Sequence, residues 1–231
     1  KAISTSFLIL KEYPLISNLG PFTAIPVFKD KAFYIALILA IFTILFGTRN
    51  LEATERHEGL VAAIAFESLI KLIAFLAVGV FVTYGIYEGF GDIFARAKAD
   101  PELQTLFTIQ PTIGSYASWG IHIFLSMMAV IFLPRQFQVT VVENVNEDHL
   151  NKAIWLFPLY LLAINIFVLP IAFGGVMRFA QGAVDADTFV LTIPMIEQKP
   201  ALAMLVFIGG MSAATGMVIV ATIALATMIC N

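Results

Sequence analysis

The sequence predicts an all-α, polytopic bundle of transmembrane helices. Three windows contain no Asp, Glu, Lys or Arg, namely Leu103–Pro134, Ala153–Met177 and Pro200–Asn231. A helix needs about 20 apolar residues to cross a hydrocarbon layer of roughly 30 Å, and each window has that length. The chain is 60% hydrophobic and 13% charged, whereas soluble domains carry about 25% charged residues. A lipid bilayer is therefore the expected surrounding of most of this chain, and its long apolar runs are expected to be helical.

Two further apolar stretches bring the expected number of spans to five. We place the spans at residues 31–47, 59–87, 112–134, 153–173 and 201–231. Residues 1–10 resemble the end of a helix, and the prolines between Glu12 and Asp30 predict a loop. The chain starts at Lys1 and stops inside an apolar run. We therefore expect residues 1–231 to be an internal piece of one larger membrane domain.

The polar segments between the spans alternate in length. Thr48–Glu58 and Glu143–Lys152 are short, and we expect them on one side of the membrane. Glu88–Pro111 and Gly174–Lys199 are longer and are expected on the other side. In the stretch from Phe90 to Ala97, apolar residues recur at helical spacing between charged ones. This amphipathic segment is typical of a helix that lies on the membrane surface.

Several classes of function are disfavoured by the residues. A net charge of −3 offers no basic stripe for nucleic acid. Cys230 is the single cysteine, which excludes an internal disulfide and a thiolate metal site. The stretch Glu55–Gly59 lacks the second histidine of a zinc-protease motif, and the chain has no nucleophile elbow or phosphate-binding loop. We therefore expect neither an enzyme nor a bound organic cofactor.

Glu67 and Lys71 are ionisable residues inside the second span. They are four residues apart and share one face of a helix. Ionisable residues within a span cost a few kcal/mol or more unless they are paired, and they usually face the bundle interior or a water-filled path. They therefore mark either a pathway for a solute or cation, with Glu67 as the acceptor, or a structural pair that neutralises itself.

Pro134 is the last residue of the third expected span, and Arg135 and Gln136 follow it directly. Proline lacks a backbone donor and interrupts a helix, and transporters use interrupted helices near their binding sites. Arg135 has the geometry to bind a carboxylate through two hydrogen bonds. The alternative is that Pro134 ends the helix and Arg135 anchors it at the membrane interface.

Three more polar residues lie in the apolar spans. Ser212 and Thr215 in the last span offer oxygens to Na⁺, although such hydroxyls also bond to their own helix. The glycines beside them indicate close helix packing. His122 in the third span suits a proton pathway or a ligand contact, or it simply packs beside Trp119.

Two segments of the chain resemble a known family. TERHEGLVAAIAFESLIKLIAF and LPRQFQVTVVENVNEDHLNKAIWLFPLYLLAINIFVLP are similar to sequences of the sodium/solute symporters. The resemblance is closest to the symporter-type membrane domains of bacterial sensor histidine kinases, which are relatives of the sodium/proline symporter. It extends over essentially the whole chain.

The resemblance implies an inverted-repeat bundle of the leucine-transporter type in a bacterial inner membrane. It implies transport of a small solute, such as the amino acids histidine or proline, coupled to Na⁺ or H⁺. The alternative is a sensory input domain that detects the solute and signals to a kinase domain elsewhere in the full-length chain. The implied sodium site falls on Ser212 and Thr215, where the expected serine pair is not kept. The coupling ion therefore stays open.

Overall fold

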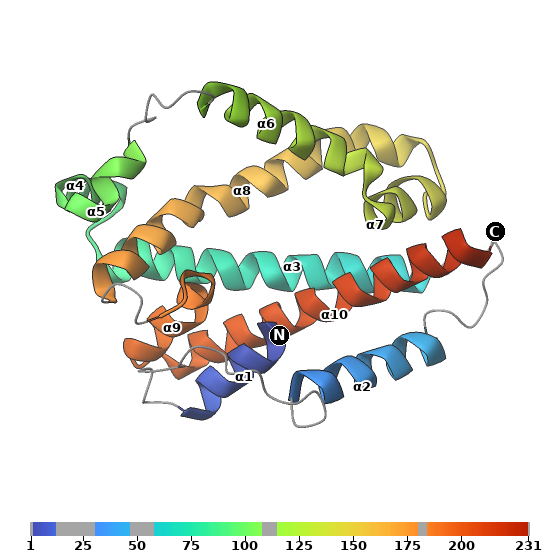
Figure 1. Ribbon diagram of the computed structural model, residues 1–231, viewed down its shortest axis with the longest axis horizontal. Helices are drawn as coiled ribbons and strands as arrows, with labels where there is room; N and C mark the ends of the chain where they lie inside the picture. Colours follow the sequence, from blue (N-terminus) through green and yellow to red (C-terminus); the bar gives the residue numbers. More distant parts are fainter. Residues whose placement is uncertain (1, 13–30, 47–57, 108–114, 180–183, 231) are drawn as a thin grey trace.

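The described part of the chain is entirely helical. The computed structural model describes residues 2–12, 31–46, 58–107, 115–179 and 184–230. Its α-helices are α1 (Ala2–Glu12), α2 (Lys31–Phe46), α3 (Glu58–Val80), α4 (Phe90–Ala99), α5 (Pro101–Gln104), α6 (Ser115–Phe132), α7 (Pro134–Phe137), α8 (Asp148–Arg178), α9 (Phe189–Ile196) and α10 (Pro200–Cys230) (Figure 1). Two π-helical turns, Phe81–Ile86 and Gln138–Val142, extend α3 and α7, and two 3₁₀ turns cover Thr105–Phe107 and Ala186–Thr188. The loops expected at residues 13–30 and 48–57 lie outside the described residues.

Three helical segments are long and apolar enough to cross a membrane. They are Val61–Ile86, Asp148–Arg178 and Pro200–Ile229. A fourth crossing results if the bent pair formed by Tyr116–Val130 and Pro134–Val142 counts as one span. The chain therefore has the structure of a multi-pass membrane protein, with three or four spans among the described residues.

Helix α2 accounts for one of the five expected spans that the described residues do not show. It contains 16 residues, which corresponds to about 24 Å at a rise of 1.5 Å per residue. The hydrocarbon layer is roughly 30 Å thick, so α2 alone does not reach across it. The described part of the span expected at residues 31–47 is thus apolar but short.

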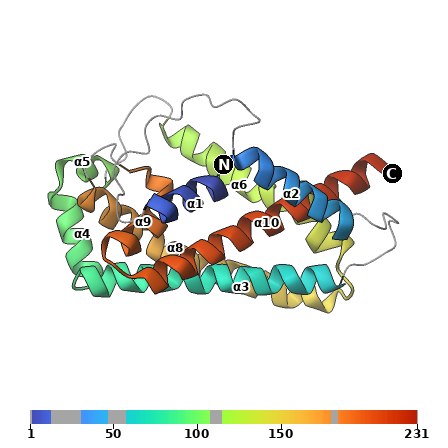
Figure 2. The same cartoon turned by 90° about the horizontal axis from the view of Figure 1, so that it is seen from below.

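Helices α3, α8 and α10 form the centre of the bundle. Helix α8 runs parallel to α3, because Phe167 packs at Gly79 and Gly174 packs at Val82. Helix α10 runs antiparallel to both (Figures 1 and 2). Helices α1 and α2 contact α10 on the side away from α3. Glycine allows these close approaches, as is usual where helices pack in a bilayer.

The third predicted span is broken just before Arg135. Helix α6 ends at Phe132, Leu133 has an extended backbone, and Pro134 occupies the first turn of α7. Proline is well suited to that position, because its missing N–H would have no partner inside the helix. The two helical segments are bent by 42°. The structure therefore has an interrupted helix here, which combines both readings of Pro134: one helix ends, and another begins at once.

The amphipathic segment α4 packs on protein. Ile93 and Ala97 are fully buried in an apolar cluster that includes Val78, Ile171 and Ile193. Helices α4 and α9 lie together at one end of α3 and α8 (Figure 2). The sequence correctly indicates a helix with one apolar face, but that face covers the ends of neighbouring helices instead of a membrane surface.

Ion pairs and a cation–π contact lie at the same end of the bundle. Arg178 at the end of α8 pairs with Glu197, which follows α9. Arg96 pairs with Asp92 at 2.7 Å, and its guanidinium lies 5.6 Å from the centre of the Tyr87 ring. Burial raises the pKa of Tyr87 above its ordinary value. The segment expected as a long loop at Gly174–Lys199 thus includes the end of α8 and all of α9, held together by charge and packing.

Candidate functional site

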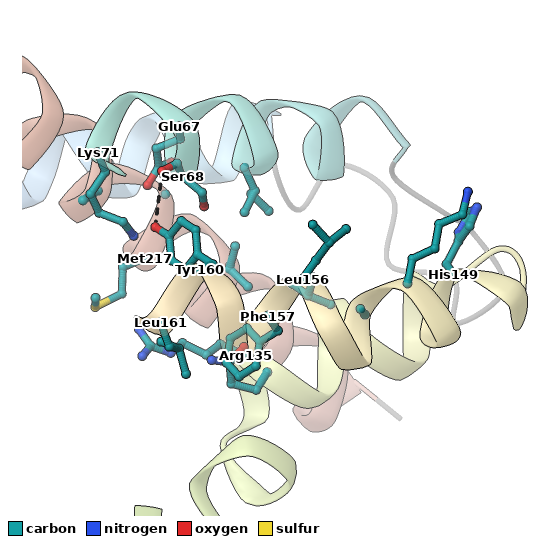
Figure 3. Close-up of a pocket in the computed structure, with 18 residues that line it drawn as sticks. Glu67, Ser68, Lys71, Arg135, His149, Leu156, Phe157, Tyr160, Leu161 and Met217 are labelled. Atoms are coloured by element: carbon teal, nitrogen blue, oxygen red, sulfur yellow. Dashed lines mark hydrogen bonds between the residues drawn. The ribbon is translucent and has the colours of Figure 1, made fainter. Parts of the chain in front are cut away.

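A polar-lined cavity of about 820 Å³ lies between α3, α7, α8 and α10 (Figure 3). We call it the wide cavity. Its wall is mostly apolar, and its polar or charged lining residues are Glu67, Ser68, Lys71, Arg135, Gln136, His149, Lys152 and Tyr160. A largely apolar wall with a few placed polar groups is the usual composition of a small-molecule site.

Helix α3 places Glu67 and Lys71 on the cavity side of the bundle. Both side chains are partly buried, and both line the wide cavity. Among the described residues, no ion pair within 4 Å joins them. The carboxylate of Glu67 instead packs against Gly216 of α10, where any side chain larger than hydrogen would overlap it. Glu67 is thus available to a ligand, with its position set by a glycine.

Helix α7 places Arg135 and Gln136 on another wall of the wide cavity. Both residues lie in the first turn after the break at Leu133. In Figure 3, Arg135 lies on the opposite side of α8 from Glu67 and Lys71. Because α7 begins with Pro134, the backbone before Arg135 does not continue the helical path of α6. The break turns the Arg135 side chain towards α8 and α10.

Tyr160 connects two walls of the wide cavity. Its hydroxyl group donates a hydrogen bond of 3.3 Å to the backbone carbonyl of Ser68 (Figure 3). This contact joins α8 to α3 one residue away from Glu67. His149 and Lys152 line the cavity nearer the start of α8.

The charges of the wide cavity are unequal. Lys71, Arg135 and Lys152 are cationic, whereas Glu67 is the one carboxylate among the lining residues that the structure describes. An excess of positive charge favours a ligand with a carboxylate or another anionic group. A single acid inside the same space can accept an ammonium group or a coupling cation. The lining therefore offers cationic groups to an anionic solute and, on the other side of α8, one acidic group to a cation.

Three of the sequence-predicted residues lie away from the wide cavity. His122 lines a separate open hollow of about 780 Å³ along α6, and its Nδ1 lies 2.7 Å from the carbonyl of Ser118. Thr215 donates to the Met211 carbonyl at 2.9 Å, and neither Thr215 nor Ser212 is among the residues lining the wide cavity. The structure thus brings together Glu67, Lys71, Arg135 and Gln136, and it separates them from the hydroxyl pair and the histidine.

The described residues contain no group of three or more His, Cys, Asp or Glu side chains that could hold a metal ion. A sodium ion needs only a few oxygen ligands, which hydroxyl and carbonyl groups can supply. Ser212 and Thr215 therefore stay a prediction on α10.

Sequence reasoning missed Tyr160, Lys152 and His149 as parts of the site. Tyr160 offered a signal, since it is a hydroxyl-bearing residue in the middle of an apolar span. Lys152 and His149 belong to a polar turn, and nothing local distinguishes them from solvated side chains. Only the packing of α8 beside α7 brings them to the cavity.

Searches against protein-family models, curated proteins and solved structures find no match to this chain. The functional argument therefore depends on the residues and their geometry.

Proposed function

We propose that this chain belongs to a membrane domain that transports a small amino acid, such as histidine or proline, coupled to Na⁺ or H⁺. The observation that carries the proposal is the wide cavity, which places Glu67, Lys71 and Arg135 between apolar helices. Ionisable residues are costly in a membrane and are retained there chiefly for function. Its volume of about 820 Å³ lies within the range of about 300–1,000 Å³ found for small-molecule pockets.

The solute and the coupling ion have separate partners in this proposal. Arg135 binds the carboxylate with two hydrogen bonds, the mode that its planar guanidinium favours. Glu67, on the other side of α8, accepts the coupling cation or proton. Gln136 contributes a neutral hydrogen-bonding group beside Arg135.

The interrupted helix supports a transport mechanism. Transporters form their sites where helices are broken near the middle of the membrane, and they move one group of helices against another around that site. The break at Leu133 lies directly beside Arg135. The resemblance to the sodium/solute symporters supports the same proposal, because it implies an inverted-repeat bundle of the leucine-transporter type in a bacterial inner membrane.

Uptake by proteoliposomes tests the proposal. The purified full-length protein is reconstituted, and radiolabelled L-histidine and L-proline are supplied with an imposed Na⁺ or H⁺ gradient. We expect accumulation of one of them above its equilibrium level, lost when an ionophore collapses the gradient. Protein-free liposomes are the control.

Binding without uptake would instead favour the sensory alternative, in which the solute occupies the same cavity and the signal passes to a kinase domain in the full-length chain. Isothermal titration of the detergent-purified protein with both amino acids measures that binding. If neither binding nor uptake is found, the proposed function is wrong.

A further inference from the structure

Lys71 lines two separate cavities. Besides the wide cavity, it borders a narrow cavity of about 190 Å³ between α1, α3, α9 and α10. The other polar side chains of the narrow cavity are Ser6, Asp187 and Thr188. Among the described lining residues of the two cavities, Lys71 is the one that they share.

The two cavities follow one another along the contact between α3 and α10. On α3, the wide cavity extends from Ile64 to Lys71 and the narrow cavity from Lys71 to Phe75. On α10, the narrow cavity ends at Gly210 and the wide cavity begins at Ala213. Because the two helices are antiparallel, both place the boundary at the same level.

The boundary itself is closed by tightly packed backbone. A Cβ atom added to Gly209 would lie 3.0 Å from the Cβ of Ala74 and 3.6 Å from the Cα of Lys71. A solute therefore passes this level only when α3 and α10 move apart. Lys71 lies at this level on a long, flexible side chain, and it is the charged residue that borders both cavities.

The cavities reach opposite ends of the bundle. The wide cavity includes the exposed residues His149 and Lys152 at the start of α8, whereas the narrow cavity includes the exposed residue Asp187 just before α9. The start of α8 and helix α9 lie at opposite ends of the bundle (Figure 1). A continuous passage through both cavities would therefore connect the two sides of the membrane.

We propose that the two cavities are halves of one solute path and that Lys71 is the gate between them. Its ammonium group binds the anionic group of the solute in the wide cavity and moves with it towards the narrow cavity. The carboxylate of Asp187 then competes for the ammonium group, which releases the solute at that end. The inference rests on the proposed function, because it names the residue and the ligand group through which transport occurs.

Thiol labelling from each side of the membrane tests the gate. Cysteines are introduced one at a time into a cysteine-free full-length protein, and a charged, membrane-impermeant methanethiosulfonate reagent is added to right-side-out or inside-out vesicles. We expect Lys71→Cys to react from both faces, Gln136→Cys from one face and Asp187→Cys from the other. Leu69→Cys is the control on the outer surface of α3, where Leu69 is 52% exposed, and we expect no reaction from either face.

The labelling rates from the two faces test the proposed mechanism. A minor conformation is populated at about 0.1–10%, so Lys71→Cys reacts roughly 10- to 1,000-fold more slowly from the less favoured face. Saturating L-histidine or L-proline, whichever is transported, slows the reaction of Lys71→Cys and leaves that of Asp187→Cys unchanged. Reaction of Lys71→Cys from one face only, with and without the solute, would overturn the inference.

The gate and the proposed function can fail separately. Labelling of Lys71→Cys from both faces, without uptake by the natural protein, would support the path and contradict amino-acid transport. Uptake by the natural protein, with labelling of Lys71→Cys from one face, would contradict only the role of Lys71 as the gate.

Gly209→Ala gives a second measurement if Lys71→Cys does not fold. The added methyl group tightens the boundary, so we expect slower uptake at unchanged solute affinity. Gly120→Ala on α6 is the matched control, because an added Cβ meets nothing within 4 Å there. We expect its uptake rate to equal that of the natural protein. Equal uptake rates of the two variants would contradict the gate.

Discussion

The hydroxyl group of Tyr160 on α8 donates to the backbone carbonyl of Ser68 on α3, at a distance of 3.3 Å. The contact lies beside Glu67, which packs against Gly216 of α10. Three central helices therefore meet at one level, where the only acidic side chain among the described lining residues of the wide cavity is also found. A change in this contact alters the shape of the proposed site as well as the stability of the bundle.

Tyr160→Phe removes the hydrogen bond and keeps the ring. We expect the free energy of unfolding to fall by about 0.6 kcal/mol, the mean for hydrogen bonds between membrane helices. Thermal unfolding in detergent measures the change. Tyr116→Phe is the matched control, because Tyr116 is 71% exposed on α6. This substitution should leave the unfolding temperature unchanged. Equal effects of the two variants would remove the assigned role of the hydrogen bond.

Glu67→Gln keeps the shape of the side chain and removes its charge. A hydrogen bond to a charged group contributes about 1.5–3 kcal/mol, so gradient-driven uptake should fall by about 10- to 100-fold. The unfolding temperature should change little, since Glu67 makes no ion pair among the described residues. Uptake at the natural rate would show that Glu67 takes no part in binding or coupling.

Arg135→Ala removes the proposed partner of the solute carboxylate. We expect the dissociation constant of the transported amino acid to rise by about 10- to 100-fold, again because a charge-assisted bond is lost. Arg135→Lys should recover only part of the affinity, because an ammonium group does not bind a carboxylate through two parallel bonds. Titration calorimetry measures both variants. Lys98→Ala, on the outer part of α4, should bind as the natural protein does.

Gly79→Ala tests the close approach of α3 and α8. An added Cβ atom would overlap the side chain of Phe167, and overpacking of this kind costs about 1–3 kcal/mol. We therefore expect a lower unfolding temperature in detergent. Gly91→Ala is the control, because nothing lies within 4 Å of a Cβ atom there. Its unfolding temperature should stay equal or rise slightly, since alanine favours a helix over glycine.

Asp92→Asn tests the charge pair on α4. The hydrogen bond from Arg96 holds the pKa of the Asp92 carboxyl below its ordinary value, and the backbone N–H of Glu88 adds to the effect. A carboxyl with a lowered pKa stabilises the folded state above its unfolded pKa of about 3.9, and this stability is lost as the pH falls through the folded pKa.

The natural protein should therefore unfold at a higher temperature than Asp92→Asn near neutral pH. The difference should shrink below about pH 4. Melting curves of the two proteins across this range measure it. A difference that is independent of pH would show that the Asp92 charge does not stabilise the fold.

The long helices could be predicted from the sequence, because a long apolar run in a bilayer satisfies its backbone hydrogen bonds by forming a helix. Helices α8 and α10 match charge-free windows, and α3 matches the stretch around Glu67 and Lys71. The ends differ by several residues. Helix α8, for example, begins at Asp148 and continues to Arg178, since polar residues can continue a helix beyond the hydrocarbon layer.

The arrangement of the helices could not be predicted in the same way. The pattern of α4 shows which face is apolar but does not distinguish lipid from the ends of α3 and α8 as its partner. Gly216 and Glu67 are far apart in the chain, and although Glu67 is conspicuous as an acid inside a span, nothing in its own helix indicates Gly216 as its neighbour. Their contact depends on how α10 packs on α3, which the sequence of either helix does not contain.

The extended residue Leu133 separates α6 and α7 mechanically. Helix α6 ends at Phe132 and α7 starts at Pro134, so that only Leu133 connects them. A tilt of α6 in the surrounding lipid therefore need not rotate α7. Changes in bilayer thickness should accordingly alter the tilt of α6, while the guanidinium of Arg135 on α7 keeps its distance from α10.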